Sequence, residues 1–233
     1  MTPAEQNHQL KILLRLAHDP VGISGASGSE TVTAELAPAP SACSFWRRAE
    51  TAKFIADAKS HTNCKVGAHV MGFTLEGEDM QALGALVETM TGVAYILPEE
   101  VPALPRLPEH KAWHYTPLSV ATVSPELVLL WIDGRQVMLV QEAMGSAHWK
   151  SGQGLRTTGR PACGALALAY HHAQAVLSFG CAGMRTFTEI PDGFMLLVVP
   201  GEAVEGLCHA LEQTAKSNAA VQCVYDKQKS LFA

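Results

Sequence analysis

Residues Pro161–Arg185, PACGALALAYHHAQAVLSFGCAGMR, form the stretch on which the fold prediction rests. Cys163 opens an Ala- and Leu-rich run, Gly164–Ala175, which predicts a helix about 18 Å long. The next run, Val176–Gly180, spans roughly 16 Å when extended and leads to Cys181. If the chain runs in one direction as the helix and returns as the strand, the sulfurs of Cys163 and Cys181 lie at the same end of this helix–strand unit. A thiol that begins a helix is biased toward thiolate, so the pair suits metal binding or redox chemistry.

A similar order occurs earlier in the chain. Cys43 precedes a predicted helix, Phe45–Ala58, and Cys64 follows a polar return, Lys59–Asn63. This return is shorter than the one before Cys181, so it favours a close approach of Cys64 to Cys43 less strongly.

The two arrangements predict an internal duplication. Gly77–Leu83 resembles Gly201–Leu207 at an offset of 124 residues (201 − 77). The leading cysteines are offset by 120 (163 − 43) and the second cysteines by 117 (181 − 64). The alternative is that Ala-rich helices of similar pattern look alike by chance. If the duplication is real, cysteines from both halves could meet near a pseudo-twofold axis.

The predicted fold class is α/β, with α+β as the alternative, in two similar halves. Each half contains a cysteine-led helix, a strand and an amphipathic helix. The division places a first half-repeat at 1–97, a linker with four prolines at 98–112 and a second half-repeat at 113–233. We expect the halves to pack as one globular unit. Leu127–Ile132 is a continuous apolar run, which is typical of a buried central strand.

The remaining pattern predicts further elements. Helices are expected at Met1–Ala17, Asp79–Met90, Arg135–Ala143 and Ala203–Ser217. Strands are expected at Val21–Ser24, Gly67–Phe73 and Phe194–Val199, and loops at Gly25–Ser29 and Gly145–Gly159.

Charge and composition narrow the functional classes. The chain of 233 residues has 17 Lys and Arg against 22 Asp and Glu, a net charge of −5, and no basic stripe that would indicate a nucleic-acid partner. It shows no signal-peptide pattern and no apolar run long enough to span a membrane. A cytoplasmic location is therefore the expectation. In that compartment six cysteines indicate metal binding or catalysis rather than disulfides.

These residues resemble a known family, the domain-of-unknown-function family 169, found widely in archaea and anaerobic bacteria. The resemblance covers roughly Leu10–Leu211 and rests on the cysteines and their neighbours together with one strand and the segment after it. Those residues are Cys43, Ala49, Cys64-x-x-Gly67, Leu127–Ile132, Gly134-x-Gln136-x-Met138, Pro161-x-Cys163 and Gly180-Cys181-x-Gly183-x-Arg185. The resemblance implies no activity. It implies that Cys43, Cys64, Cys163 and Cys181 are cysteines that members of the family have in common.

Four thiols suit either zinc or an iron–sulfur cluster. No two cysteines have the close C-x-x-C spacing of a zinc ribbon. Small residues beside the sulfurs, such as Gly67 and Gly183, favour a bulky cluster, so [4Fe–4S] ranks first, zinc second and metal-free thiol chemistry third. The competing interpretation is that the thiols are inert and buried, as we expect for Cys208 and Cys223.

Other side chains near the cysteines are weaker candidates. His61 and His69 could form hydrogen bonds that orient the ligand cysteines. The simpler interpretation of each is a surface histidine or one hydrogen-bonded elsewhere. Arg185 could hold an anionic substrate or offset cluster charge, or could form a surface salt bridge.

The sequence thus predicts a cytoplasmic iron–sulfur protein with a redox or sulfur-metabolism role, its ligands being Cys43, Cys64, Cys163 and Cys181. The alternative is a non-catalytic zinc or small-ligand binding protein. The partner would be an unidentified redox protein or a small-molecule substrate, and homo-oligomer formation is left open. The sequence does not decide whether the protein is an enzyme.

Overall fold

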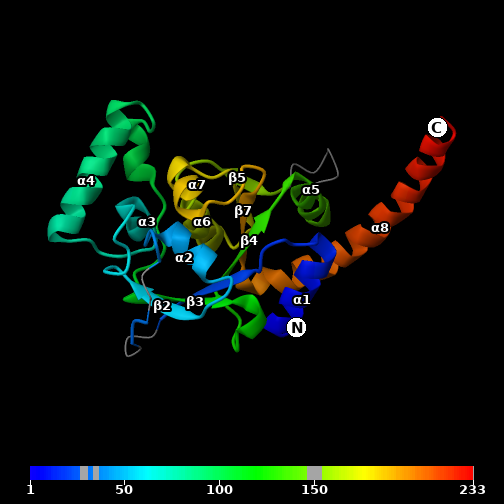
Figure 1. Cartoon of the computed structure of the whole chain (residues 1–233), viewed down its shortest axis with the longest axis horizontal. Helices are drawn as coiled ribbons and strands as arrows, with labels where there is room; N and C mark the ends of the chain where they lie inside the picture. The colour runs from blue at the N-terminus through cyan, green and yellow to red at the C-terminus, as the bar shows by residue number, and fades with distance from the viewer. Residues whose placement is uncertain (27–30, 34–36, 146–153, 233) are drawn as a thin grey trace.

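A seven-stranded sheet with helices on both faces organises the part of the chain that the computed structural model describes, residues 1–26, 31–33, 37–145 and 154–232 (Figure 1). The predicted α/β class is confirmed. The predicted loops at Gly25–Ser29 and Gly145–Gly159 lie partly outside the described residues. In the described part of the second loop, Arg156–Thr158 is a strand.

The strands are β1 (Val21–Gly25), β2 (Phe54–Asp57), β3 (Ala112–Pro117), β4 (Leu127–Ile132), β5 (Arg156–Thr158), β6 (Val176–Ser178) and β7 (Met195–Pro200). The α-helices are α1 (Pro3–Leu14), α2 (Ala42–Arg48), α3 (Lys65–Val70), α4 (Gly77–Gly92), α5 (Gly134–Ala143), α6 (Gly164–His172), α7 (Ala182–Thr188) and α8 (Val204–Ser230). Short 3-10 helices are η1 (Pro98–Ala103), η2 (Leu118–Val120) and η3 (Gly201–Ala203).

Local chemistry explains where several helices begin. Thr2 accepts a hydrogen bond from the backbone N–H of Glu5, and the Glu5 carboxylate accepts the backbone N–H of Thr2, which together form a capping box ahead of α1. Asp133 and Gln136 form the same reciprocal pair at the start of α5. These caps satisfy N–H groups that have no partner within the helix.

The sheet has the order β2-β3-β1-β4-β7-β6-β5. Its central strand is β4, which runs antiparallel to β1, with Val21 opposite Leu129, and to β7. All six residues of β4 are buried, as its continuous apolar sequence predicts. Only β5 and β6 pair in parallel.

Helices cover both faces of this sheet. The alternation of side chains along β4 sends Leu127, Leu129 and Trp131 to one face, where they pack in a core with α2, α3 and α6. Val128 and Leu130 point to the other face, where α1, α5 and α8 cover them. The four predicted ligand cysteines all belong to the first face.

The two sides of the sheet repeat one arrangement. In residues 21–117 the strand that comes first in the chain, β1, lies nearest the middle of the sheet. The strand that comes last, β3, lies next to it, and β2 lies beyond β3. In residues 127–200, β4, β7 and β6 occupy the same three positions. The order helix, strand, helix is also shared by α2-β2-α3 and α6-β6-α7. The internal duplication itself stays a hypothesis.

The predicted register of that duplication differs from this arrangement. Gly77 begins α4, which precedes the last strand of its side, whereas Gly201 begins η3 after β7. The junction in the sheet lies between β3 and β4, whereas the sequence placed its linker at 98–112. The half-repeat boundaries remain predictions.

Three local predictions need correction. The helix predicted at Phe45–Ala58 ends at Arg48, and β2 follows at Phe54–Asp57. Gly67–Phe73, predicted as a strand, lies largely within the helix α3. The helix predicted at Asp79–Met90 runs from Gly77 to Gly92 as α4; none of its residues is fully buried, although Leu83 and Leu86 pack against the core.

Two helices extend away from the body (Figure 1). The helix α4 stands beyond α3, and the C-terminal part of α8 projects on the opposite side of the molecule. Val221, Val224 and Tyr225 on that part of α8 are exposed. No helix within the described residues combines the length and apolar character needed to cross a membrane.

Candidate four-cysteine site

Each of the four predicted ligand cysteines stands at the start of a helix. Cys43 is the second residue of α2, whereas Cys64, Cys163 and Cys181 directly precede α3, α6 and α7. Backbone N–H groups at helix starts have no partner within the helix and can donate to sulfur. The Met184 N–H donates to Cys181 Sγ at 3.3 Å.

The four thiols lie close enough to influence one another's pKa. Burial raises the pKa of Cys43, and negative charge on the other three thiols raises it further. Burial likewise raises the pKa of Cys163, with added contributions from Cys64 and Cys181. Burial raises the pKa of Cys64 as well, and Cys181 adds to that rise. Every pair among the four therefore lies within electrostatic range, including Cys64 and Cys43.

The four thiols divide into a deep pair and a pocket pair. Cys43 and Cys163 are 4% and 3% exposed. Cys64 and Cys181 are half-buried and line a pocket of about 380 Å³. The deep pair are the leading cysteines of the two helix–strand–helix units, and the pocket pair are the second cysteines.

Backbone conformation sets the position of Cys64. Its φ of 52° and ψ of 70° lie in the left-handed region, which a non-glycine residue rarely adopts. The nearby N–H groups of Gly67 and Val66 oppose the rise in its pKa, although its sulfur makes no capping hydrogen bond. Gly67 also allows α3 to approach α2, because an added Cβ would lie 3.1 Å from the Ala42 Cβ. Gly183 lies beside Cys64, where an added Cβ would be 3.9 Å from Sγ.

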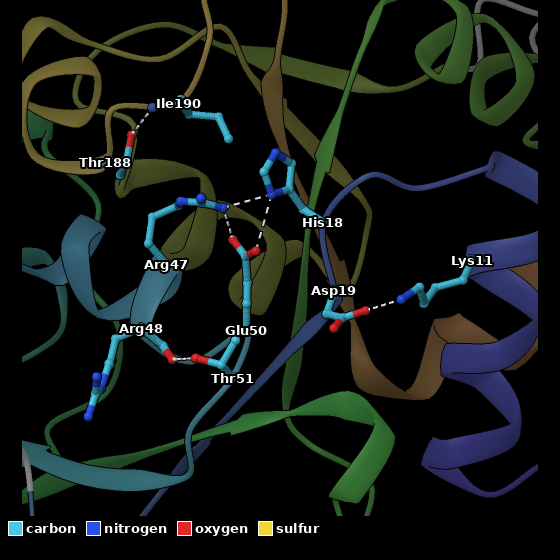
Figure 2. A network of polar contacts seen from close by, with 9 residues as sticks. All are labelled: Lys11, His18, Asp19, Arg47, Arg48, Glu50, Thr51, Thr188 and Ile190. Carbon is cyan, nitrogen blue, oxygen red and sulfur yellow. Dashed lines mark hydrogen bonds and ion pairs between the residues drawn. The ribbon is translucent and has the colours of Figure 1, made fainter.

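A polar network holds the far end of α2 (Figure 2). Arg47 Nη1 lies 2.8 Å from His18 Nδ1, and Glu50 Oε2 lies 3.1 Å from the same nitrogen. Arg47 also pairs with Glu50. The His18 ring packs edge-on against Phe194, with centroids 5.2 Å apart. This network fixes α2, and with it Cys43, between the segment before β1 and the segment before β7.

Two of the predicted supporting residues, His61 and Arg185, are held by backbone carbonyl groups. His61 is fully buried between Phe45 and Phe73, and its Nδ1 lies 2.7 Å from the Asp57 carbonyl oxygen. Burial lowers its pKa to about 4, so the imidazole is neutral. The Arg185 guanidinium donates to the carbonyls of Pro191 and Phe179, which braces the turn around Cys181.

The structure also places His69 and the two remaining cysteines. His69 lies on α3, where burial and then Arg106 lower its pKa, and Arg106 Nε donates to its backbone carbonyl. Cys208 is buried in the core on the opposite face of the sheet. The prediction that Cys223 is buried is wrong, because the part of α8 that carries it is exposed.

Sequence reasoning missed Tyr115 on β3. Its side chain is fully buried, and its hydroxyl has no hydrogen-bond partner among the residues that the structure describes. Burial raises its pKa, and negative charge on Cys43 and Cys163 raises it further, so the phenol lies close to the deep pair. The β3 pattern could have indicated a buried aromatic residue, but not that it meets two distant cysteines.

The described side chains do not form a ready site for one metal ion. Within those residues, no three His, Cys, Asp or Glu side chains are grouped so that they could hold one. A tetrahedral zinc site would draw its sulfurs to within about 4 Å of one another, because Zn–S bonds are about 2.3 Å. A zinc ion would therefore require these thiols to move.

A family model matches residues 9–210, most of the chain. The family is DUF169, described as "Uncharacterised ArCR". No curated protein and no solved structure matches the chain.

Proposed function

The chain belongs to the DUF169 family, and from its four-cysteine site we propose that it binds an iron–sulfur cluster for redox or sulfur-linked chemistry on a small molecule. Cys43, Cys64, Cys163 and Cys181 would be the ligands, with [4Fe–4S] as the favoured type. Such a cluster supplies one-electron transfer when bound.

The convergence of the thiols carries this proposal. Four cysteines, separated by up to 138 residues of sequence (181 − 43), lie within electrostatic range of one another in a protein with no other buried cysteine on that face of the described structure. At neutral pH the raised pKa values keep Cys43 and Cys163 as thiols unless a positive centre offsets the burial of charge. Backbone N–H groups at the helix starts supply the donors that cluster sulfurs commonly receive.

The unpaired Tyr115 hydroxyl supports the fit of a sulfur-rich group. A buried donor without an acceptor costs about 1–3 kcal/mol, so such groups usually face a bound partner. The hydroxyl lies near the deep pair, where thiolate or sulfide sulfur would accept its hydrogen bond. Tyr115 would then hold a proton at a fixed position beside the ligands and stabilise negative charge on them.

Two features bear on the alternatives. The present positions of the thiols disfavour zinc, because no three of them in the described structure are close enough to bind one ion. The pocket beside Cys64 and Cys181 favours a second candidate, a small-ligand binding protein that uses these thiols without a metal.

Anaerobic reconstitution with iron and sulfide tests the proposal. The wild-type protein should turn brown and bind iron and sulfide in stoichiometric amounts. Each of the variants C43S, C64S, C163S and C181S should lose most of the iron, whereas C208S and C223S should retain it and serve as matched controls. Circular dichroism of each apo variant separates loss of ligand from loss of fold.

Two outcomes would overturn the proposal. One is a colourless protein that takes up zinc in preference to iron. The other is iron uptake that survives serine at all four positions.

A further inference from the structure

The pocket that meets Cys64 and Cys181 is bounded by elements from both sides of the sheet. Its walls come from α4 and η1 on one side, and from β5 and the starts of α6 and α7 on the other. The cavity of about 380 Å³ falls in the size range of small-molecule sites. Most of its lining is apolar, for example Val87, Met90 and Leu168.

One cation stands in this apolar lining. Arg160 is exposed, and its guanidinium carbon lies 4.5 Å from the centroid of the Tyr95 ring. No carboxylate in the described residues is paired with Arg160. Stacking on an aromatic ring orients a guanidinium while leaving its N–H donors available for a carboxylate.

The other charged group of the lining is already engaged. Glu100 Oε2 accepts the Leu97 backbone N–H at 2.6 Å, which caps η1. The Tyr95 hydroxyl accepts the Ala182 N–H at 3.1 Å, so its own proton is free to be donated. The pocket therefore offers two donors, Arg160 and Tyr95, an apolar wall and two thiols.

We propose that this pocket binds a small organic carboxylate with an apolar body. The carboxylate would pair with Arg160 and Tyr95, and the apolar body would lie against α4 and α6. The ligand would then be held beside Cys64 and Cys181, and its role as the substrate of the cluster rests on the function proposed above. The pairing is a charge-assisted, two-pronged contact of the kind that arginine favours with carboxylates.

Ligand-observed NMR on the apo protein tests the pocket without any metal. Hexanoate, hexanol and hexylamine share one apolar chain and differ in head-group charge. Hexanoate should bind most tightly, and R160Q should weaken it about tenfold, the size of one charge-assisted hydrogen bond, with little effect on hexanol. R160K should retain part of the affinity. R135Q, which removes an exposed arginine on the other face of the sheet, is the matched control and should change nothing.

The results separate this inference from the proposed function. The proposed carboxylate site is overturned if hexanoate does not bind, if it binds no more tightly than hexanol, or if R160Q leaves its affinity unchanged. This holds whether or not the protein takes up iron. Arg160-dependent binding of hexanoate by a protein that takes up no iron supports the site and overturns only the cluster.

Discussion

The two helix–strand–helix units, α2-β2-α3 and α6-β6-α7, place their cysteines alike but support them differently. In both units the leading cysteine is deep and the second lines the pocket. Cys181 has an extended backbone, and its sulfur accepts a hydrogen bond from Met184. Cys64 instead has a left-handed backbone and makes no side-chain cap. The first unit is also followed by α4 and η1, whereas the second leads directly to β7.

This difference shows which parts of a repeated arrangement are free to change. The depth of each cysteine is set by packing against the common sheet, so it is alike in both units. The segment after the second cysteine meets no such constraint. In the first unit it has become the wall of a pocket. The agreement in depth is what the duplication hypothesis expects, and under that hypothesis α4 would be an addition to the first unit.

Chemical rescue should separate the deep pair from the pocket pair. In C64G and C181G, an added small thiol such as methanethiol can enter through the pocket and replace the lost ligand. In C43G and C163G it cannot reach the buried position. We expect every variant to lose iron affinity by at least about tenfold, with recovery only in the pocket pair. Iron content after reconstitution with and without methanethiol measures this, and equal rescue of all four would contradict the division by depth.

Lowering the pH should destabilise the protein through His61, which follows β2 in the first helix–strand–helix unit. Its pKa falls from 6.5 to about 4 on folding because the imidazole is buried. Between these values the unfolded chain binds more protons than the folded protein, so stability falls as the pH falls. The contribution is about 3 kcal/mol, since one pH unit corresponds to about 1.4 kcal/mol. Urea unfolding of the wild type and H61L at neutral and acidic pH checks this, and parallel losses in the two proteins would contradict it.

Replacing Tyr115 should affect the empty and loaded sites in opposite ways. In the apo protein Y115F removes an unpaired buried hydroxyl, so the free energy of unfolding should stay the same or rise by about 1 kcal/mol. In the loaded protein it removes a hydrogen bond to sulfur, so the reduction potential should become lower. Urea unfolding and potentiometry give the two values. A purely structural tyrosine would lower stability and leave the potential unchanged.

The smallest effects are expected outside both units. C208A should cost about 1 kcal/mol because Cys208 is fully buried, whereas C223A should change stability by less than about 0.5 kcal/mol because that thiol is exposed. Thermal unfolding measures both. Loss of bound iron in C208A would show that the site extends beyond the four cysteines.

The sequence best predicted those helices, strands and turns that are determined by residues close together in the chain. The helix after Cys163, the strand Val176–Ser178 and the turn at Cys181 follow from periodicity and turn residues, and β4 follows from its unbroken apolar run. The helix α3 was missed because its two valines favour a strand in isolation and its glycine is a poor helix former. Packing of Gly67 against Ala42 overrides that preference.

Contacts between distant segments account for the rest. The pairing of β3 with β1 could not be inferred from the Pro-rich stretch between the predicted halves. Tyr115 and Arg160 join the site only through the sheet and the pocket, and neither carries a local signal. The convergence of the cysteines was predicted from an assumed symmetry, and Cys64 was its weakest member. The structure places Cys64 within electrostatic range of the other three.

The central pairing of β1 with β4 has a consequence during translation. Val21 lies opposite Leu129, so β1 leaves the ribosome 108 residues (129 − 21) before its inner partner. At synthesis rates of about 5–20 residues per second this delay is about 5–20 s. Cys43 and Cys64 appear within this interval, before either Cys163 or Cys181 has been made. The nascent chain therefore displays two of the four predicted ligand thiols together with a strand that still lacks β4, which makes this interval the time at which a chaperone or a reducing environment would matter most.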